Sequence, residues 1–150
     1  MSFPSMSMPE TVAIAADHGG FELKNILVPE LRALGFSVLD LGTTNSDAVD
    51  YPDMAEKVAA AIGDGRAQRG VLICGTGIGM SIAVNRHREL RGALVHDALS
   101  ARLARQHNDA NVLVLGGRLL GAELAKDCLK IFFTTGFEGG RHARRVAKLS

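Results

Sequence analysis

Short apolar segments alternate with amphipathic segments along the chain, and this alternation constrains the fold more than any other feature. The predicted strands are the apolar runs at 11–16, 36–41, 71–73, 92–95 and 112–115. Amphipathic helical patterns lie between and after these runs, and a last, basic helix is expected at 139–149. Strands that alternate with helices pair in parallel and are covered on both faces. The sequence therefore predicts an α/β fold, a Rossmann-like three-layer α/β/α sandwich with a five-stranded parallel sheet.

The chain length suits one domain. Its 150 residues can bury a sizeable core without disulfide or metal support. We expect a single domain at 11–150, preceded by a disordered tail at 1–10. The tail contains Pro4 and Pro9 and has neither the basic nor the apolar region of a signal peptide.

The composition limits the kinds of binding partner that we expect for this protein. The net charge is +1, which gives no reason to expect nucleic acid, and no apolar run approaches the ~18 residues of a membrane span. The two cysteines fit no zinc-binding spacing, and nothing suggests an oxidising compartment. The sequence predicts a cytoplasmic protein with free thiols and no membrane partner.

Polar residues follow three of the predicted strands directly. They are Asp17-His18, Cys74-Gly75-Thr76 and Gly116-Gly117-Arg118. Ligands of parallel α/β sheets bind beyond the carboxyl ends of the strands. We therefore expect these three groups to meet at one edge of the sheet.

The segment 74–81, CGTGIGMS, carries the strongest chemical signal. Its alternating glycines expose backbone N–H groups ahead of a helix, which makes an anion hole. The helix end favours the Cys74 thiolate, and a thiolate beside such a hole suits proton abstraction next to a carbonyl. The segment could instead be a loop that binds a nucleotide phosphate, although its spacing fits neither common phosphate-loop motif. Cys74 could instead be an inert buried thiol. Cys128, inside an amphipathic helix, is interpreted as inert.

Histidines and arginines supply further candidates. His107 ends a helix, where it could transfer a proton to or from a sugar ring oxygen, or simply form a helix cap with Asn108. Arg141 and Arg145 are four residues apart and share one helix face, which suits a phosphate clamp, a solvated basic face or an RNA-binding patch. Arg118 is a third candidate for phosphate. His142 is left undecided.

Several motifs together resemble one known family. They are DHGGFELK at 17–24, DYPD at 50–53, ICGTGIGMSIAVN at 73–85, SARLARQHNDANVLVLGGR at 100–118 and EGGRHARRV at 138–146. In this order they resemble the type B ribose-5-phosphate isomerases of the ribose/galactose isomerase family. The similarity extends from about residue 11 to residue 147.

The resemblance implies roles for particular residues. It implies that Cys74 is the base between carbons 1 and 2, that His107 opens the ring, and that Thr76 lies near the sugar. The residues expected to bind substrate are Asp17, His18, Tyr51, Gly75, Gly77, Ile78, Gly79, Asn108, Arg118, Arg141 and Arg145. The resemblance also implies a homodimer or homotetramer with a composite active site, and neither a metal nor an organic cofactor.

The expected reaction is the interconversion of D-ribose 5-phosphate and D-ribulose 5-phosphate through an enediolate, in the non-oxidative pentose phosphate pathway. Two alternatives stay open. One is isomerisation of a six-carbon aldose 6-phosphate such as allose or galactose 6-phosphate. The other is a non-catalytic module that binds a sugar phosphate or a nucleotide.

Overall fold

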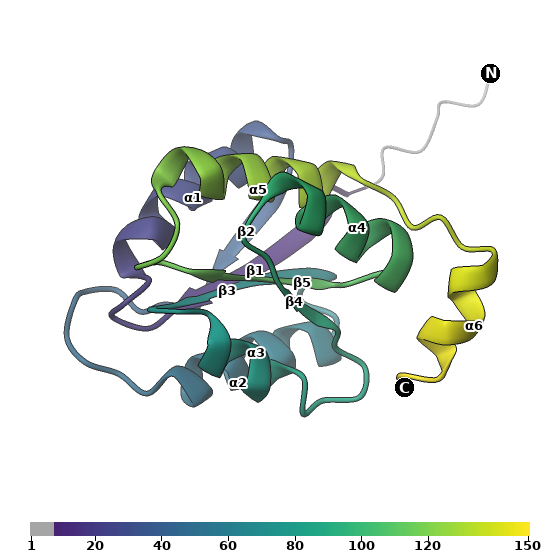
Figure 1. Ribbon diagram of the computed structural model, residues 1–150. Coiled ribbons are helices and arrows are strands. Elements are labelled where there is room, and N and C mark those ends of the chain that lie inside the picture. Colours follow the sequence, from purple (N-terminus) through teal and green to yellow (C-terminus); the bar gives the residue numbers. More distant parts are fainter. Residues whose placement is uncertain (1–7) are drawn as a thin grey trace, which may run out of the picture.

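The computed structural model describes residues 8–150, which form a parallel sheet between two layers of helices (Figure 1). The elements are β1 (Thr11–Ala16), α1 (Phe21–Ala33), β2 (Ser37–Asp40), α2 (Tyr51–Gly63), β3 (Arg69–Cys74), α3 (Ile78–Val84), β4 (Gly92–Leu94), α4 (Ala98–Asn108), β5 (Val112–Gly116), α5 (Ala122–Thr134) and α6 (Arg141–Ala147). All pairings in the five-stranded sheet are parallel, in the order β2-β1-β3-β5-β4. The predicted fold class is confirmed.

The two faces of the sheet bury different residues of the same strands. In β1, Val12, Ile14 and Ala16 pack with α1, α4 and α5, whereas Ala13 and Ala15 pack with α2 and α3. Figure 1 shows these two helix layers above and below the sheet. Because successive side chains of a strand point to opposite faces, the apolar run at 11–16 serves both cores.

The order of the strands determines where in the sheet a ligand-binding site is expected. The chain passes from β1 to β2 through α1, and from β2 to β3 through α2, which lies on the other face. The direction of winding therefore reverses between β1 and β3. Their carboxyl ends carry Asp17 and Cys74, and a switch point of this kind is where α/β sheets bind ligands.

The amino-terminal prediction is only partly covered, because residues 1–7 of the expected tail lie outside the described residues. Glu10 is held in place. Its carboxylate accepts hydrogen bonds of 2.6 and 3.1 Å from Arg69, and its carbonyl accepts one of 3.0 Å from Ser37 N. Ordered structure thus begins no later than Glu10.

Candidate active site

The groups that follow β1, β3 and β5 meet at one edge of the sheet, as the sequence predicted. They surround a pocket of about 430 Å³. Its lining residues are Asp17, Tyr51, Cys74, Gly75, Thr76, Ile78, Gly79, Ile82 and Arg118. Nine residues from four separate parts of the chain therefore form one concave surface.

Backbone hydrogen bonds fix these loops to one another. Asp17 N donates to Ile73 O at 3.2 Å, Gly117 N donates to Cys74 O at 2.8 Å, and Arg118 N donates to Gly75 O at 2.9 Å. A Cβ atom on Gly117 would lie 2.5 Å from the carbonyl oxygen of Gly19. Glycine is required there because the loops after β1 and β5 are in backbone contact.

The Cys74 sulfur lies at the start of the glycine-rich turn. Gly77 N donates to Cys74 Sγ at 3.2 Å, and the positive φ of Gly77, 79°, turns the chain into α3. Cys74 is only 4% exposed, yet it is one of the residues that line the pocket. A backbone donor is thus directed at the sulfur from the glycine-rich turn.

Cys128 has a different environment. It is fully buried in α5, and burial, together with the negative charges of Asp127 and Asp97, raises the pKa of its thiol to about 11. A thiol that is protonated and inaccessible is chemically inert. This agrees with the interpretation from sequence.

Three more predicted ligands lie at or near the pocket. The Arg118 side chain passes over Gly75, and the Tyr51 ring packs against Gly79. His18 is exposed, and its Nδ1 accepts a hydrogen bond of 3.3 Å from Val49 N. With Nδ1 acting as acceptor in a neutral ring, the proton lies on Nε2.

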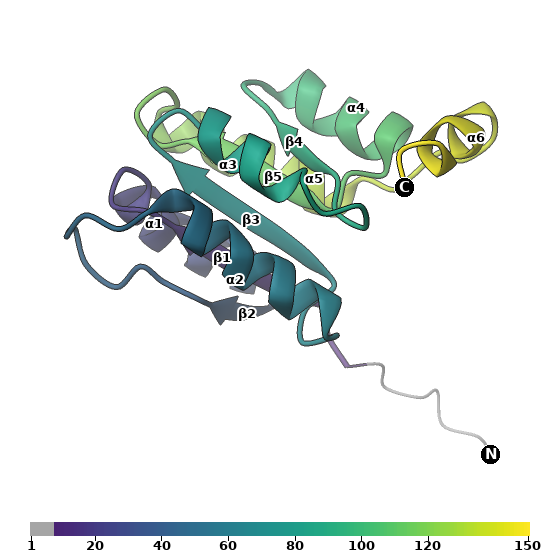
Figure 2. The same cartoon turned by 90° about the horizontal axis from the view of Figure 1, so that it is seen from below.

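The remaining predicted ligands lie elsewhere in the chain. His107 and Asn108 end α4, which starts near the carboxyl end of β4 and returns toward the amino ends of the strands. Arg141 and Arg145 lie on α6, which Figure 2 shows beyond the end of the sheet opposite the arrowhead of β3. None of the four lines the Cys74 pocket. One chain thus does not bring Cys74 and Arg118 together with His107, Arg141 and Arg145.

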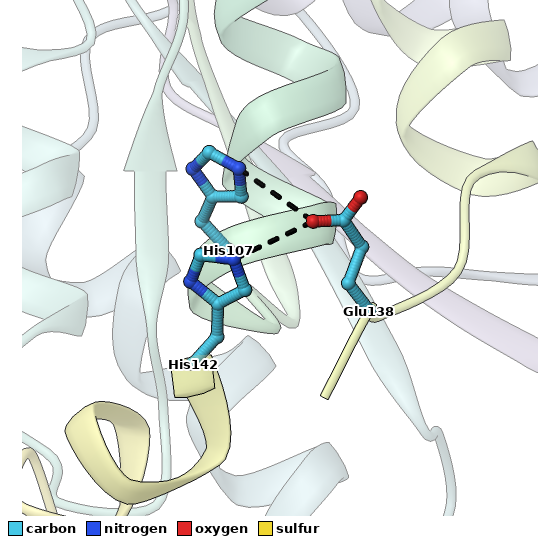
Figure 3. A group of neighbouring side chains, drawn as sticks. All are labelled: His107, Glu138 and His142. Atoms are coloured by element: carbon cyan, nitrogen blue, oxygen red, sulfur yellow. Dashed lines mark ion pairs between the residues drawn. The ribbon is translucent and has the colours of Figure 1, made fainter. Parts of the chain in front are cut away.

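His107 belongs to a second cluster of side chains. Its ring stacks on that of His142 with centroids 4.2 Å apart, and Glu138 Oε1 lies 3.7 Å from His107 Nε2 and 3.4 Å from His142 Nε2 (Figure 3). Burial of the His142 ring lowers its pKa, as do the positive charges of His107 and Arg141. The sequence alone leaves the role of His142 undecided and does not point to Glu138, although the two residues are four positions apart.

Arg105 holds the connector between α5 and α6, which contains Glu138, against the end of α4. Its guanidinium donates to Thr135 O at 3.1 Å, to Ala110 O at 2.7 Å and to Asp109 Oδ1 at 2.8 Å. Glu138 N donates to Gln106 O at 3.1 Å. These bonds attach the connector between α5 and α6 to the end of α4, beside His107.

A parallel α/β sheet with a thiol, a carboxylate and a guanidinium in a pocket at its switch point defines a binding site for a small polar molecule. The chain belongs to the ribose/galactose isomerase family, whose sequence model matches residues 12–149. Together with the relatives below, this membership makes the chain a sugar-phosphate isomerase.

Curated relatives and solved structures agree with this placement. Ribose-5-phosphate isomerase B of Escherichia coli is 44% identical over 139 residues, which cover 93% of each chain. D-erythrulose-4-phosphate isomerase of Pectobacterium atrosepticum is 43% identical and covers 93% of this chain and 92% of its own. The crystal structure of a ribose 5-phosphate isomerase from Thermotoga maritima is 51% identical, with a TM-score of 0.90 and coverage of 93% of this chain and 97% of that one. Within residues 8–150, every helix is too short or too polar to traverse a bilayer.

Proposed function

We propose that this protein interconverts D-ribose 5-phosphate and D-ribulose 5-phosphate, with Cys74 as the base. One observation carries the proposal: the Cys74 sulfur accepts a backbone N–H while it lines a pocket that also contains Asp17 and Arg118. A base beside N–H donors can remove a proton next to a carbonyl while the donors stabilise the oxyanion that forms. This is the step that an aldose–ketose isomerase needs.

The proposed reaction has two stages. In the first, His107 transfers a proton to the ring oxygen of the sugar, a solvent water takes the proton of the anomeric hydroxyl, and the ring opens to the aldehyde. In the second, the Cys74 thiolate takes the proton from carbon 2, and the backbone of 75–79 stabilises the enediolate with Thr76 alongside. The thiol returns the proton to carbon 1, a proton moves from the oxygen of carbon 2 to that of carbon 1, and the ketose is complete.

The remaining residues are proposed to hold the substrate. Asp17, His18, Tyr51 and Asn108 would bind hydroxyl groups, and Arg118, Arg141 and Arg145 would bind the phosphate. Guanidinium groups are suited to phosphate because they donate two parallel hydrogen bonds. Binding energy from a phosphate distant from the reacting carbons can position those carbons against Cys74.

We further propose that two chains complete each site. His107 and the arginines of α6 lie outside the Cys74 pocket of their own chain, so a second copy must supply them if they act there. The rim of the pocket supports such a contact, because Ile78 and Ile82 line the pocket and share an exposed face of α3, and Leu119, which follows Arg118, is also exposed. Helix α6 spans only Arg141–Ala147 and packs mainly on α4, so it projects from the body as a segment available to a partner (Figure 1).

The length of the sugar is part of the proposal. The E. coli and T. maritima relatives are named for ribose 5-phosphate, whereas the Pectobacterium relative is named for D-erythrulose 4-phosphate. We favour the five-carbon sugar, which would place the enzyme in the non-oxidative pentose phosphate pathway. The two free, buried cysteines fit a reducing compartment, so a cytoplasmic location also stays a prediction.

The test is an assay of ribulose 5-phosphate formation by the wild type and by Cys74→Ala. We expect the wild type to be active with EDTA present and the variant to lose turnover by about 10²-fold or more while substrate affinity changes little. Cys128→Ala is the matched control and should keep full turnover. Full activity of Cys74→Ala would refute the assignment of the base, and a kcat/KM higher for a four- or six-carbon sugar phosphate would refute the assigned substrate.

A further inference from the structure

Two imidazoles and a carboxylate meet at the cluster of His107, Glu138 and His142, outside the Cys74 pocket (Figure 3). We propose that this cluster is an inhibitory binding site for a transition-metal cation such as Zn²⁺. The binding itself is independent of the proposed isomerase function. The inhibitory effect rests on the proposed role of His107.

The spacing of the ligand atoms supports the proposal. One atom from each residue lies within 4.8 Å of the other two. Glu138 Oε1 is 3.7 Å from His107 Nε2 and 3.4 Å from His142 Nε2. Tetrahedral zinc with bonds of about 2.0–2.2 Å separates neighbouring ligand atoms by roughly 3.4 Å, which is longer than an ordinary hydrogen bond. The cluster is thus already close to the dimensions of a zinc site.

The orientation of the rings defines the movement that binding requires. The imidazoles are stacked with an angle of 14° between their planes, whereas a metal lies near the plane of each ring that binds it. The side chain of His142 is 9% exposed and is confined, but that of His107 is 39% exposed and can turn about its side-chain bonds. Rotation of His107 alone would direct both nitrogens at one point beside the carboxylate, and a water molecule would complete the tetrahedron.

The donor set selects the kind of metal. Imidazole nitrogen binds Zn²⁺, Cu²⁺ and Ni²⁺ well, whereas Mg²⁺ and Ca²⁺ prefer sites made of oxygen ligands. Two imidazoles and one carboxylate also form the ligand set of several zinc enzymes. We therefore expect Zn²⁺ to bind and Mg²⁺ not to compete.

The metal would act on the residue that opens the sugar ring. A zinc ion on Nε2 of His107 occupies the nitrogen lone pair and holds the ring away from the substrate. In the two-chain site proposed above, His107 of one chain serves the pocket of the other, so zinc would lower turnover without touching Cys74. Chelation would restore the activity.

The binding experiment must exclude the Cys74 thiol as the ligand, since thiolates also bind zinc. Calorimetric titration of Cys74→Ser with Zn²⁺ is therefore the primary measurement, and it needs no catalytic activity. We expect one equivalent per chain, and we expect Glu138→Gln and His142→Asn in this background to weaken binding by about tenfold or more, since even outer-shell partners of a metal are worth that much. The matched control is His87→Asn, which removes an imidazole 2.9 Å from Glu56 and should leave the affinity unchanged.

The outcomes separate the two proposals. The metal site would be overturned if Cys74→Ser did not bind Zn²⁺. It would also be overturned if Glu138→Gln and His142→Asn both kept the same affinity for Zn²⁺ while thermal melts showed them folded. In the wild type, Zn²⁺ should reduce ribulose 5-phosphate formation and EDTA should restore it. The same Zn²⁺ concentration should inhibit Glu138→Gln less, which distinguishes the cluster from the Cys74 thiol. Binding at the cluster with unchanged turnover would overturn the inhibitory role, whereas the isomerase proposal is decided by the assays without zinc described above.

Discussion

At the residue scale, the two cysteines show how the same side chain acquires different properties from its surroundings. Cys74 is the last residue of β3 and lines a pocket, while Cys128 lies inside α5 at 0% exposure. The sequence already separated them, because only Cys74 is followed by glycines at alternate positions.

Alkylation should distinguish these thiols. At pH 8, iodoacetamide should modify Cys74 and leave Cys128 intact, because Cys128 is inaccessible and its raised pKa of about 11 keeps it protonated. Its reactivity should appear only as the pH rises toward that value or when the protein unfolds. Peptide mass spectrometry measures the site of modification, and ribose 5-phosphate should slow the labelling. Equal labelling of the two cysteines in the folded protein would contradict the conclusion that Cys128 is inaccessible and protonated.

Gly117 is the residue at which a single methyl group should disturb the site. A methyl carbon on Gly117 would lie 2.5 Å from the Gly19 carbonyl oxygen, so Gly117→Ala must separate the loops that carry Asp17 and Arg118. We expect a loss of about 1–3 kcal/mol in the free energy of unfolding, measured by urea denaturation. Gly136→Ala is the control, since no atom lies within 4 Å of its Cβ position. Equal stability of the two variants would argue against close contact of the loops.

At the element scale, an ion pair anchors the loop between β2 and α2. Lys24 in α1 is 2% exposed, and its Nζ donates to both carboxylate oxygens of Asp40 at 2.9 and 2.8 Å. Asp40 Oδ1 also accepts a hydrogen bond of 3.0 Å from Gly42 N. This loop leads to Val49, which donates to His18, and to Tyr51 in the pocket. The pair thus links the core to residues of the site.

Removal of the Asp40 charge should leave the Lys24 ammonium buried without a partner. We expect Asp40→Asn to lower the free energy of unfolding by about 2–4 kcal/mol, somewhat less than for a fully buried pair, since Asp40 is 40% exposed. The double variant Lys24→Met/Asp40→Asn should recover much of that stability, because it removes the unpaired charge. Urea denaturation of the three proteins checks this, and a double variant no more stable than Asp40→Asn would contradict it.

At the scale of the whole molecule, the separation of two groups of residues within one chain is the dominant feature. Cys74 and Arg118 lie at the carboxyl edge of the sheet, and His107 lies at the far end of α4. If each site combines Cys74 of one chain with His107 of another, defects in different chains should complement one another.

A mixture of Cys74→Ala and His107→Asn chains tests this arrangement. Each variant alone should have very low turnover. After unfolding and refolding together, each mixed dimer contains one site with both residues intact, so random pairing should restore about a quarter of the wild-type activity per chain. An ultracentrifuge run of the same sample measures the assembly. Activity that stays at the level of the separate variants would show that the two residues do not act in one site.

Much of the fold could be predicted from the sequence because its signals are local. The five apolar runs marked the strands, although β3 begins at Arg69, two residues before the predicted run, where Arg69 pairs with Val12 and contacts Glu10. The convergence of Asp17, Cys74 and Arg118 also followed, since parallel strands carry their carboxyl ends to one edge.

The stacking of His142 on His107 and the approach of Glu138 could not be predicted in this way. They depend on Arg105, which attaches the connector before α6 to the end of α4 through carbonyl groups that no side-chain pattern reveals.

The sequence by itself determined the strand–helix alternation, the parallel sheet and the reactive groups at the strand ends, because hydrophobic periodicity and glycine spacing act over a few residues. Tertiary structure alone decided which of these groups share a pocket and which form a second cluster. That outcome depends on the strand order and on contacts between residues distant in the chain, whose free energies are set by packing and hydrogen bonding in three dimensions.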